Sequence, residues 1–326
     1  MQLEDKIFDI QNDDDFIDVS LEVFNYQYKN VNVYREFCDY LKMEPSKVKT
    51  IYDIPFLPIE FFKSYSIGDL NNYDKLFLSS GTTQQERSKH YIKKLDIYKR
   101  SFLNGFHEFY GDPSDYLIAA ILPGYVDNPH SSLLYMVDHL IKTSNNSLSG
   151  FYDFSDDDLL NHLKCIQASK ANNKLIIGVS FALLSIAEKH SIDLSDCIIM
   201  ETGGMKGKRK ELVREELHSI LKESFHVNAI HSEYGMTELL SQSYSYGSGI
   251  FQETSGMKVF IRNIYQPLEL LSNNDSGGIN VIDLSNLYSV SFIATQDLGK
   301  KLSKSSFQVL GRFDHSDIRG CNLLYS

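Results

Sequence analysis

Hydrophobic residues change their spacing along this chain, and the change divides the sequence into three regions. Between 16 and 41, aromatic and aliphatic side chains recur at spacings typical of helices. Two prolines between 51 and 58 exclude a regular helix there and favour an extended segment. We therefore predict a helical N-terminal cap over 1–50, an α/β core over 51–248 and a β-rich subdomain over 249–326.

In the predicted core, helical and strand-like stretches alternate. The helical stretches are 91–110, 131–141, 156–171, one that ends near 190, and 208–225; the strands are 116–122, 174–181, 197–200 and 227–230. Such alternation is typical of a mostly parallel sheet that is covered by helices. The predicted fold class is therefore α/β.

The last region has a different texture. Strand-like runs over 258–264, 279–284, 290–295 and 307–310 are separated by polar turns. This pattern predicts a smaller β-rich subdomain rather than further βαβ units. We expect Asp297 and Arg312 in its turn loops.

Three polar segments follow predicted strands of the core, beginning at Ser79, Glu201 and Ser232. Because ligands bind at the carboxyl ends of parallel strands, we expect these segments to meet at a single crevice. The first segment, Ser-Ser-Gly-Thr-Thr over 79–83, can surround phosphates with backbone N–H groups and hydroxyls. A plain turn is the alternative that its composition leaves open.

Composition narrows the classes of function. The formal net charge of the 326 residues is −11, which leaves no basic face to neutralise nucleic-acid phosphates. The N-terminus lacks the basic start and apolar core of a signal peptide, and the most apolar run, 116–126, is too short to cross a bilayer. We therefore expect a cytoplasmic protein with no nucleic-acid partner and no membrane span.

The four cysteines, Cys38, Cys165, Cys197 and Cys321, form no C-x-x-C pair. Their spacing indicates neither a disulfide framework nor a zinc site, in keeping with a reducing compartment. Cys38 and Cys165 fall within helical patterns and Cys197 opens a strand, so we expect these three to be buried. Cys321 follows a glycine and lies two residues from an arginine, which is a setting that can lower a thiol pKa.

Five segments, in this order along the chain, resemble motifs of the adenylate-forming superfamily of acyl-CoA synthetases, peptide-synthetase adenylation domains and luciferases. They are Ser79-Ser80-Gly81-Thr82-Thr83, Gly203-Gly204, Tyr234-Gly235-Met236-Thr237-Glu238, Thr295-Gln296-Asp297 and Gly311-Arg312. More narrowly, segments 135–140, 201–207, 231–242 and 317–323 are similar to the acyl-protein synthetase (LuxE) family of bacterial fatty-acid reductase systems. The resemblance runs from about residue 55 to the last residues, and the order of all five motifs carries it.

The resemblance implies an ATP-dependent ligase. Such an enzyme activates a carboxylic acid, expected to be a fatty acid, as acyl-AMP with release of pyrophosphate and passes the acyl group to a protein thiol. The implied fold is a large N-terminal domain of mostly parallel, helix-covered sheets with a smaller β-rich subdomain. We expect the superfamily's C-terminal lid to be absent, because the chain stops at Ser326. The expected partners are the acid and an acyl-accepting protein such as a reductase or a carrier protein.

The same resemblance assigns residues to ATP and Mg²⁺. The implied nucleotide-binding residues are Ser79, Ser80, Gly81, Thr82, Thr83, Gly203, Gly204, Tyr234, Gly235, Thr237, Asp297 and Arg312. The implied catalytic residues are Thr82, Glu238 and Cys321, with Glu238 also the ligand of Mg²⁺ and Cys321 the nucleophile that receives the acyl group. Hydroxyls of the first motif would bind phosphates, Tyr234 would stack on adenine, and Asp297 and Arg312 would bind the ribose and the α-phosphate side.

One departure from the motifs and several simpler interpretations stay open. The glycine and lysine that usually follow the Thr-Thr pair are replaced by 84–89, where Arg87 and Lys89 are candidate cations. Taken alone, Glu238 can begin a helix and Asp297 can occupy a hairpin turn. A ligase that delivers the acyl group to an external carrier or small molecule, with Cys321 idle, is a second hypothesis. A nucleotide- or acyl-binding module without turnover is a third.

Overall fold

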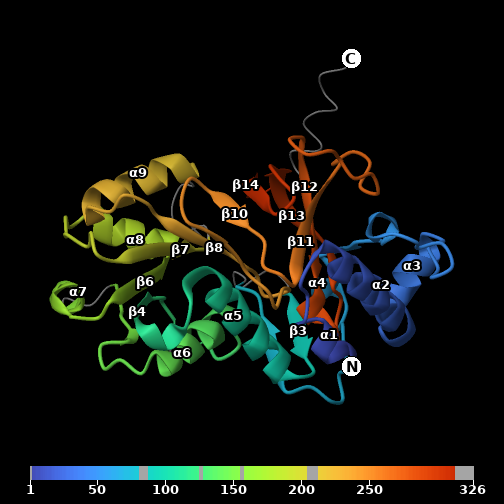
Figure 1. The fold of residues 1–326 in the computed structure, drawn as a ribbon, viewed down its shortest axis with the longest axis horizontal. Coiled ribbons are helices and arrows are strands. Elements are labelled where there is room, and N and C mark those ends of the chain that lie inside the picture. Colours follow the sequence, from blue (N-terminus) through green and yellow to red (C-terminus); the bar gives the residue numbers. More distant parts are fainter. Residues whose placement is uncertain (1, 81–86, 125–127, 155–157, 204–211, 313–326) are drawn as a thin grey trace. The chain divides into compact units, whose positions relative to one another are not determined.

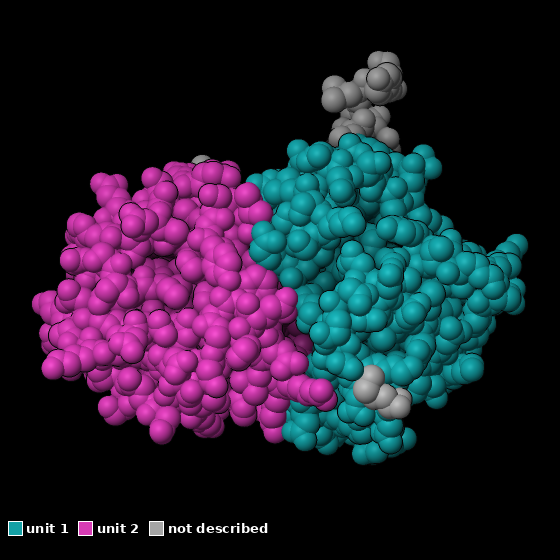
Figure 2. Space-filling model, in the orientation of Figure 1, with its two compact units in different colours: residues 1–76, 81–97, 252–326 teal, residues 77–80, 98–251 magenta. Residues whose placement is uncertain are grey.

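The computed structural model describes residues 2–80, 87–124, 128–154, 158–203 and 212–312. The chain forms two units that interleave along the sequence (Figure 2). Unit 1 comprises 1–76, 81–97 and 252–326, and unit 2 comprises 77–80 and 98–251. Each unit is made of separate chain segments, whereas the predicted regions 1–50, 51–248 and 249–326 are continuous. The division into these three regions therefore stays a prediction.

Unit 2 is built on a mostly parallel sheet (Figure 1). Its strands are β4 (Tyr116–Ile121), β5 (Gly150–Phe151), β6 (Asn173–Val179), β7 (Ile198–Thr202), β8 (His231–Tyr234) and β9 (Ser243–Ser245). Within the described residues they lie in the order β5-β4-β6-β7-β8-β9, and every neighbouring pair is parallel except β8 and β9. The predicted α/β class is therefore confirmed.

Helices cover both faces of this sheet. Figure 1 shows α8 (Ser180–Ala187) and α9 (Arg214–Phe225) on one side, with α6 (Ser132–Ser144) and most of α5 (Leu95–Tyr110) on the other. The 3-10 turn η2 (Pro113–Asp115) precedes β4, and α7 (Leu159–Ala168) precedes β6. Every residue of β4 and all but the first of β6 are buried. Near-continuous apolar strands are expected where helices cover both faces.

Unit 1 contains a mainly antiparallel sheet. Its strands are β11 (Met257–Arg262), β12 (Ser276–Asp283), β13 (Phe292–Lys301) and β14 (Ser306–Arg312), each antiparallel to the next, with β1 (Leu57–Pro58) parallel to β13. The chain passes from one unit to the other within β2 (Lys75–Leu78), within α5 and within β10 (Ile250–Gln252). Strand β2 pairs with β3 (Lys89–Ile92). The predicted β-rich part of the fold is confirmed.

Aromatic rings fasten the N-terminal helices of unit 1 to its sheet. These helices are α1 (Leu3–Lys6), α2 (Asp13–Asn30) and α3 (Asn32–Tyr40). Unit 1 also contains η1 (Ile51–Asp53), α4 (Phe61–Ser64) and, after β12, η3 (Leu284–Asn286). Phe24 of α2 and Tyr34 of α3 contact Phe292 of β13, with ring centroids 6.2 and 5.8 Å from it. Fully buried Gln27 of α2 adds hydrogen bonds, because its amide accepts from Ser291 N and donates to Ser291 Oγ, both at 3.0 Å.

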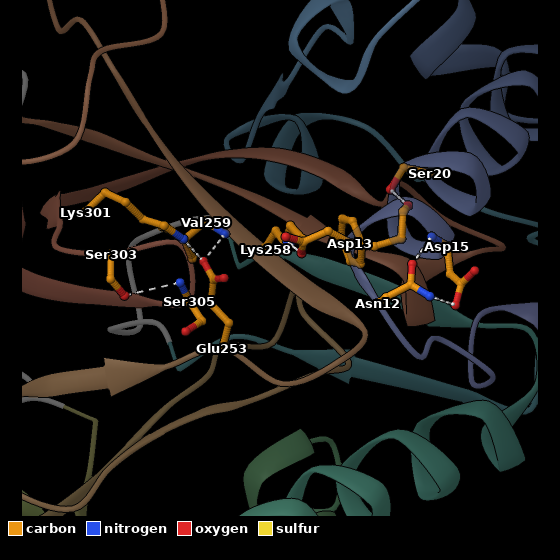
Figure 3. A network of polar contacts seen from close by, with 11 residues as sticks. Asn12, Asp13, Asp15, Ser20, Glu253, Lys258, Val259, Lys301, Ser303 and Ser305 are labelled. Atoms are coloured by element: carbon orange, nitrogen blue, oxygen red, sulfur yellow. Dashed lines mark hydrogen bonds and ion pairs between the residues drawn. The ribbon is translucent and has the colours of Figure 1, made fainter.

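A polar network joins α2, β11 and β13 (Figure 3). Lys258 of β11 forms an ion pair with Asp13 at the start of α2. In the same network, Lys301 of β13 pairs with buried Glu253, whose carboxylate also accepts the N–H of Val259 at 2.7 Å. Burial raises the pKa of Glu253 and lowers that of Lys301, so each charge depends on its partner.

Several predicted elements are wrong in their bounds; the strand expected over 290–295, for example, is β13 and extends to Lys301. The helix expected from 91 begins at Leu95, because 89–92 pairs with β2 as β3. The strand expected over 227–230 is displaced, and β8 occupies 231–234. Its residues are polar or aromatic, and all but His231 are buried, in a strand that lies between β7 and β9. Apolar content was therefore a misleading signal for this strand.

The placements of three residues are also corrected. Asp297 and Arg312 lie within paired strands and not in turn loops. Cys165 is exposed, because the buried face of α7 consists of Leu159, Leu163 and Ile166. Cys38 and Cys197 are buried as predicted, and burial raises the pKa of each thiol to about 12. Among the described helices, none combines the length and apolar character that a membrane span requires.

Candidate functional site

The ends of β7 and β8 bring several predicted residues of unit 2 together. Glu201 and Thr202 of β7 pair in register with Ser232 and Glu233 of β8. Because side chains alternate between the two faces of a sheet, Glu201 and Ser232 lie on one face and Thr202 and Glu233 on the other. This carboxyl edge therefore carries two buried carboxyl groups, one on each face.

Side chains of α8 and α9 surround Glu201. Ser180 Oγ, at the start of α8, lies 2.7 Å from Glu201 Oε2 and 2.7 Å from the carbonyl oxygen of Gly203. Arg214 Nε and His218 Nε2 of α9 lie 3.7 and 3.6 Å from Glu201 Oε1. Burial raises the pKa of Glu201, but His218, Arg214 and Ser180 outweigh it and hold the pKa below its ordinary value. We therefore expect Glu201 to be ionised.

Glu233 lies in a different environment on the opposite face. Thr202 Oγ1 donates a hydrogen bond to its carboxyl group, and Tyr244 of β9 pairs with it in register. Burial, together with the charge of Glu201, raises the pKa of Glu233 to about 7, although Thr202 opposes this rise. The two acids consequently differ in charge near neutral pH, and only Glu233 titrates there.

The backbone turns directly after β8 at Gly235. A Cβ atom at this position would clash with the Glu233 carboxyl group, so any other residue here would displace that side chain. Thr237 is half-buried and Glu238 is buried in the turn that follows. Residues 235–242 form no helix, which excludes the explanation of Glu238 as a helix start.

Tyr234, the predicted adenine-stacking residue, belongs to a layered contact on the Glu201 face. Its ring centroid lies 5.8 Å from that of Phe251 with an interplanar angle of 60°. The guanidinium of Arg214 lies over the Phe251 ring, with Cζ 5.2 Å from the centroid. Arg214 therefore contributes both to the aromatic layer and to the charge that stabilises Glu201.

The predicted phosphate segment follows β2, which pairs with β3 in a separate two-stranded sheet and is linked to unit 2 through its last residue. Leu78 N donates to the carbonyl oxygen of His130 at 2.9 Å, in the loop that follows β4. Ser79 is half-buried and Ser80 is exposed. Because β4, β7 and β8 are in one parallel series, the loop after β4 is at the carboxyl edge that also carries Glu201.

In unit 1, the structure places Asp297 opposite Arg312. The two residues pair in register on β13 and β14, and Arg312 Nε lies 4.0 Å from Asp297 Oδ1. Gln296, which precedes Asp297 on β13, accepts a hydrogen bond from Arg312 at 3.2 Å and donates one to Glu60 at 2.7 Å. Glycine is usual at this position in the motif that the segment resembles, whereas Gln296 here links Arg312 to Glu60.

Five predicted site residues lie outside the described residues: Gly81, Thr82, Thr83, Gly204 and Cys321. Their roles stay predictions, as do the ligand-binding roles of the described site residues. Sequence inspection missed Ser180, Arg214, His218 and Glu233. A usable signal was present for Ser180, which begins a helix directly after a buried strand, and none marked the other three.

Comparison with known proteins places the fold. No protein-family model and no curated protein sequence matches this chain. Among solved structures, ATP-bound MatB from Rhodopseudomonas palustris is 15% identical with a TM-score of 0.55, over 73% of this chain and 47% of that chain. A 2-hydroxyisobutyryl-CoA ligase in complex with 2-HIB-AMP and CoA is 10% identical with a TM-score of 0.66, over 94% and 70%. A luciferase-like enzyme from the mealworm Zophobas morio is 16% identical with a TM-score of 0.50, over 76% and 59%.

These similar structures are adenylate-forming enzymes, and at such identities they show the fold alone. The chain spans 47% of the length of the MatB chain. Its α/β fold is that of the large domain of adenylate-forming enzymes, as the sequence motifs predicted.

Proposed function

We propose that this chain is an ATP-dependent ligase that adenylates a carboxylic acid. One observation carries the proposal: the carboxyl edge of the unit 2 sheet gathers Glu201, Gly203, Tyr234 and Glu238 in the fold that MatB uses while bound to ATP. Parallel sheets bind ligands at this edge. In the reaction, a carboxylate oxygen attacks the α-phosphorus of ATP, and the bond to pyrophosphate breaks to give acyl-AMP and pyrophosphate.

The residues divide the work of binding ATP. Hydroxyls of Ser79 and Ser80, with Thr82 and Thr83, donate hydrogen bonds to the β- and γ-phosphates. Tyr234 stacks on adenine, while Asp297 accepts hydrogen bonds from the ribose hydroxyls and Arg312 binds the α-phosphate side. Such positioning and charge stabilisation are the main requirements of an in-line displacement.

Mg²⁺ fits the described residues in a limited way. Glu238 supplies one buried carboxylate in the turn after β8, and proteins commonly bind this ion through one or two carboxylates plus substrate phosphates. Among the described residues, no group of three or more His, Cys, Asp or Glu side chains is arranged to hold a metal ion. When bound, Mg²⁺ neutralises phosphate charge.

A finer proposal follows from the resemblance to acyl-protein synthetases. The acid is a fatty acid, and the thiolate of Cys321 attacks the carbonyl carbon of acyl-AMP, releasing AMP and forming a thioester. A reductase or carrier protein then takes the acyl group. Buried Cys38 and Cys197 have raised thiol pKa values and are poor nucleophiles, which leaves Cys165 and Cys321 as candidates. The resemblance favours Cys321.

The adenylation step is tested by carboxylate-dependent exchange between ATP and labelled pyrophosphate. Acids from acetate to palmitate are compared, with Glu238→Gln as a variant of the proposed Mg²⁺ ligand. We expect exchange that depends on chain length and falls strongly in the variant. Nucleotide binding without exchange for any acid would support a binding module and refute the ligase.

The transfer step is tested with Cys321→Ser. We expect retained pyrophosphate exchange and loss of protein-bound acyl label. Cys165→Ser is the matched control, because Cys165 is an exposed thiol and should leave both measurements unchanged. Unchanged acyl transfer in Cys321→Ser would favour an external acceptor.

A further inference from the structure

The Thr295-Gln296-Asp297 segment of β13 bulges from its sheet. Strand β12 pairs Gly278 with Leu298 and then Asn280 with Ala294, so three residues of β13 face one residue of β12. Bulges redirect side chains and are frequent next to active sites. The segment that carries the proposed ribose ligand is therefore a bulge and not a regular strand.

The carbonyl oxygen of Ile279 anchors this bulge. Thr295 Oγ1 donates to that oxygen at 2.9 Å and accepts the N–H of Asp297 at 3.1 Å. The Thr295 hydroxyl thus links the backbone of β12 at Ile279 to the backbone of β13 at Asp297. Because the N–H of Asp297 is held through Thr295, the position of Asp297 depends on where the Ile279 carbonyl lies.

Arg262, the last residue of β11, lies buried against the bulge with 7% of its surface exposed. Its Nη1 donates to the carbonyl oxygen of Ile279 at 2.7 Å and to Asn280 Oδ1 at 2.9 Å, and its Nη2 donates to the carbonyl oxygen of Thr295 at 2.5 Å. The planar guanidinium therefore joins the carbonyls on the two strands of the bulge. A lysine ammonium cannot reproduce this fork.

The backbone leaves space for this guanidinium at Gly278. A Cβ atom there would lie 2.5 Å from Arg262 Cζ and 2.8 Å from each terminal nitrogen. Real side chains do not approach so closely, so any other residue would displace the fork. Gly278 and Arg262 pair in register, and the glycine leaves the space that the guanidinium occupies.

We infer that Arg262 is a positioning residue for Asp297, acting through the Ile279 and Thr295 carbonyls to aim the bulge at the nucleotide ribose. The inference rests on the proposed function, in which Asp297 accepts hydrogen bonds from the ribose hydroxyls. Burying a permanent charge costs desolvation free energy, and the three hydrogen bonds to the bulge region offset part of this cost. Arg262 itself touches no reacting atom.

The test compares ATP with 2′,3′-dideoxy-ATP in carboxylate-dependent pyrophosphate exchange. Loss of a hydrogen bond to a charged group corresponds to a factor of about ten or more, so we expect Arg262→Lys to lower the kcat/KM preference for ATP about tenfold. The KM for the acid should not change. Asp297→Asn should lower the same preference, and the double variant should lower it no further.

Milder variants and a structural control keep the test decisive. Asn280→Ala removes one acceptor of Arg262 and should reduce the preference for ATP less than Arg262→Lys does. Gly278→Ala should reduce the preference as much as Arg262→Lys, and it replaces that variant in the test if Arg262→Lys does not fold. Val281→Ala on the same strand is fully buried and outside the network, so it should lower stability without changing the preference.

The outcomes separate the two proposals. Exchange by the wild type with an unchanged nucleotide preference in Arg262→Lys and Gly278→Ala would overturn this inference alone. A lower activity that is equal for both nucleotides would assign Arg262 a purely structural role and also overturn it. Absence of exchange in the wild type would overturn the proposed function and, with it, this inference.

Discussion

Replacing Glu233 should change how the stability of this protein depends on pH. Burial raises the pKa of Glu233 to about 7 in the folded protein, against an ordinary value of 4.5. Between these two values the folded protein binds more protons than the unfolded chain, so its free energy of unfolding falls as pH rises. The contribution of Glu233 is complete below pH 4.5 and is lost above about pH 7.

The size of this contribution follows from the two pKa values. Linkage then gives a loss of about 2–3 kcal/mol between pH 5 and pH 8, because nearly two pKa units of this range lie between the two values. Glu233→Gln resembles the protonated acid and keeps an acceptor for Thr202. We therefore expect the variant to gain about 2–3 kcal/mol relative to the wild type over this range.

Urea unfolding of both proteins at pH 5, 6, 7 and 8 measures this difference. Subtraction of the two curves cancels the titrating groups that do not interact with Glu233. Glu201 does interact with it, but its pKa lies below its ordinary value, so it stays ionised from pH 5 to 8. Thr202→Val is a matched control, because removing the hydrogen bond that lowers the pKa of Glu233 should move the transition to higher pH. A wild-type-minus-variant difference that is flat from pH 5 to 8 would refute the reasoning.

Three further predictions concern stability and nucleotide binding. Lys301→Met should lower the free energy of unfolding by about 3–5 kcal/mol, because it leaves the Glu253 carboxylate buried without its partner. The double variant with Glu253→Gln should recover much of this loss. Equal losses for the single and double variants in urea unfolding would contradict the pairing. Gln27→Leu should cost about 2–4 kcal/mol, because buried groups of the 286–291 segment lose their hydrogen bonds, and a loss below 1 kcal/mol would contradict the anchoring of α2. Gln296→Gly, which restores the usual residue of the motif, should raise the KM for ATP about two- to tenfold because Arg312 loses an acceptor. The melting temperature should be nearly unchanged. A large drop in melting temperature would instead make Gln296 a structural residue.

Local pattern was sufficient to predict most elements of this fold. The apolar runs of β4 and β6 and the stripe of α9 have one dominant period each, and tertiary packing does not override it. The strand β8 could not be predicted in this way. Its sequence, His-Ser-Glu-Tyr, is polar, and only the neighbouring strands and helices make its burial favourable.

The environment of the site was less predictable than its residues. Motif order placed Glu201, Tyr234 and Glu238 at strand ends, but it gave no indication that Glu201 and Glu233 lie on opposite faces with opposite pKa shifts. That difference depends on register between β7 and β8 and on which helix covers each face. Sequence spacing contains neither quantity.

Glycines offered a signal that went unused. Gly235 and Gly278 both lack room for a Cβ atom, and in each case a charged or titratable side chain occupies the space: Glu233 above the first and Arg262 above the second. A glycine inside a strand indicates a bulge or a close approach. The pair 277–278 in a buried strand therefore pointed to a bulge in its partner strand, and so to the segment that carries Asp297. The conformation of that segment depends on a buried arginine from a third strand, which is why no motif of three residues could reveal it.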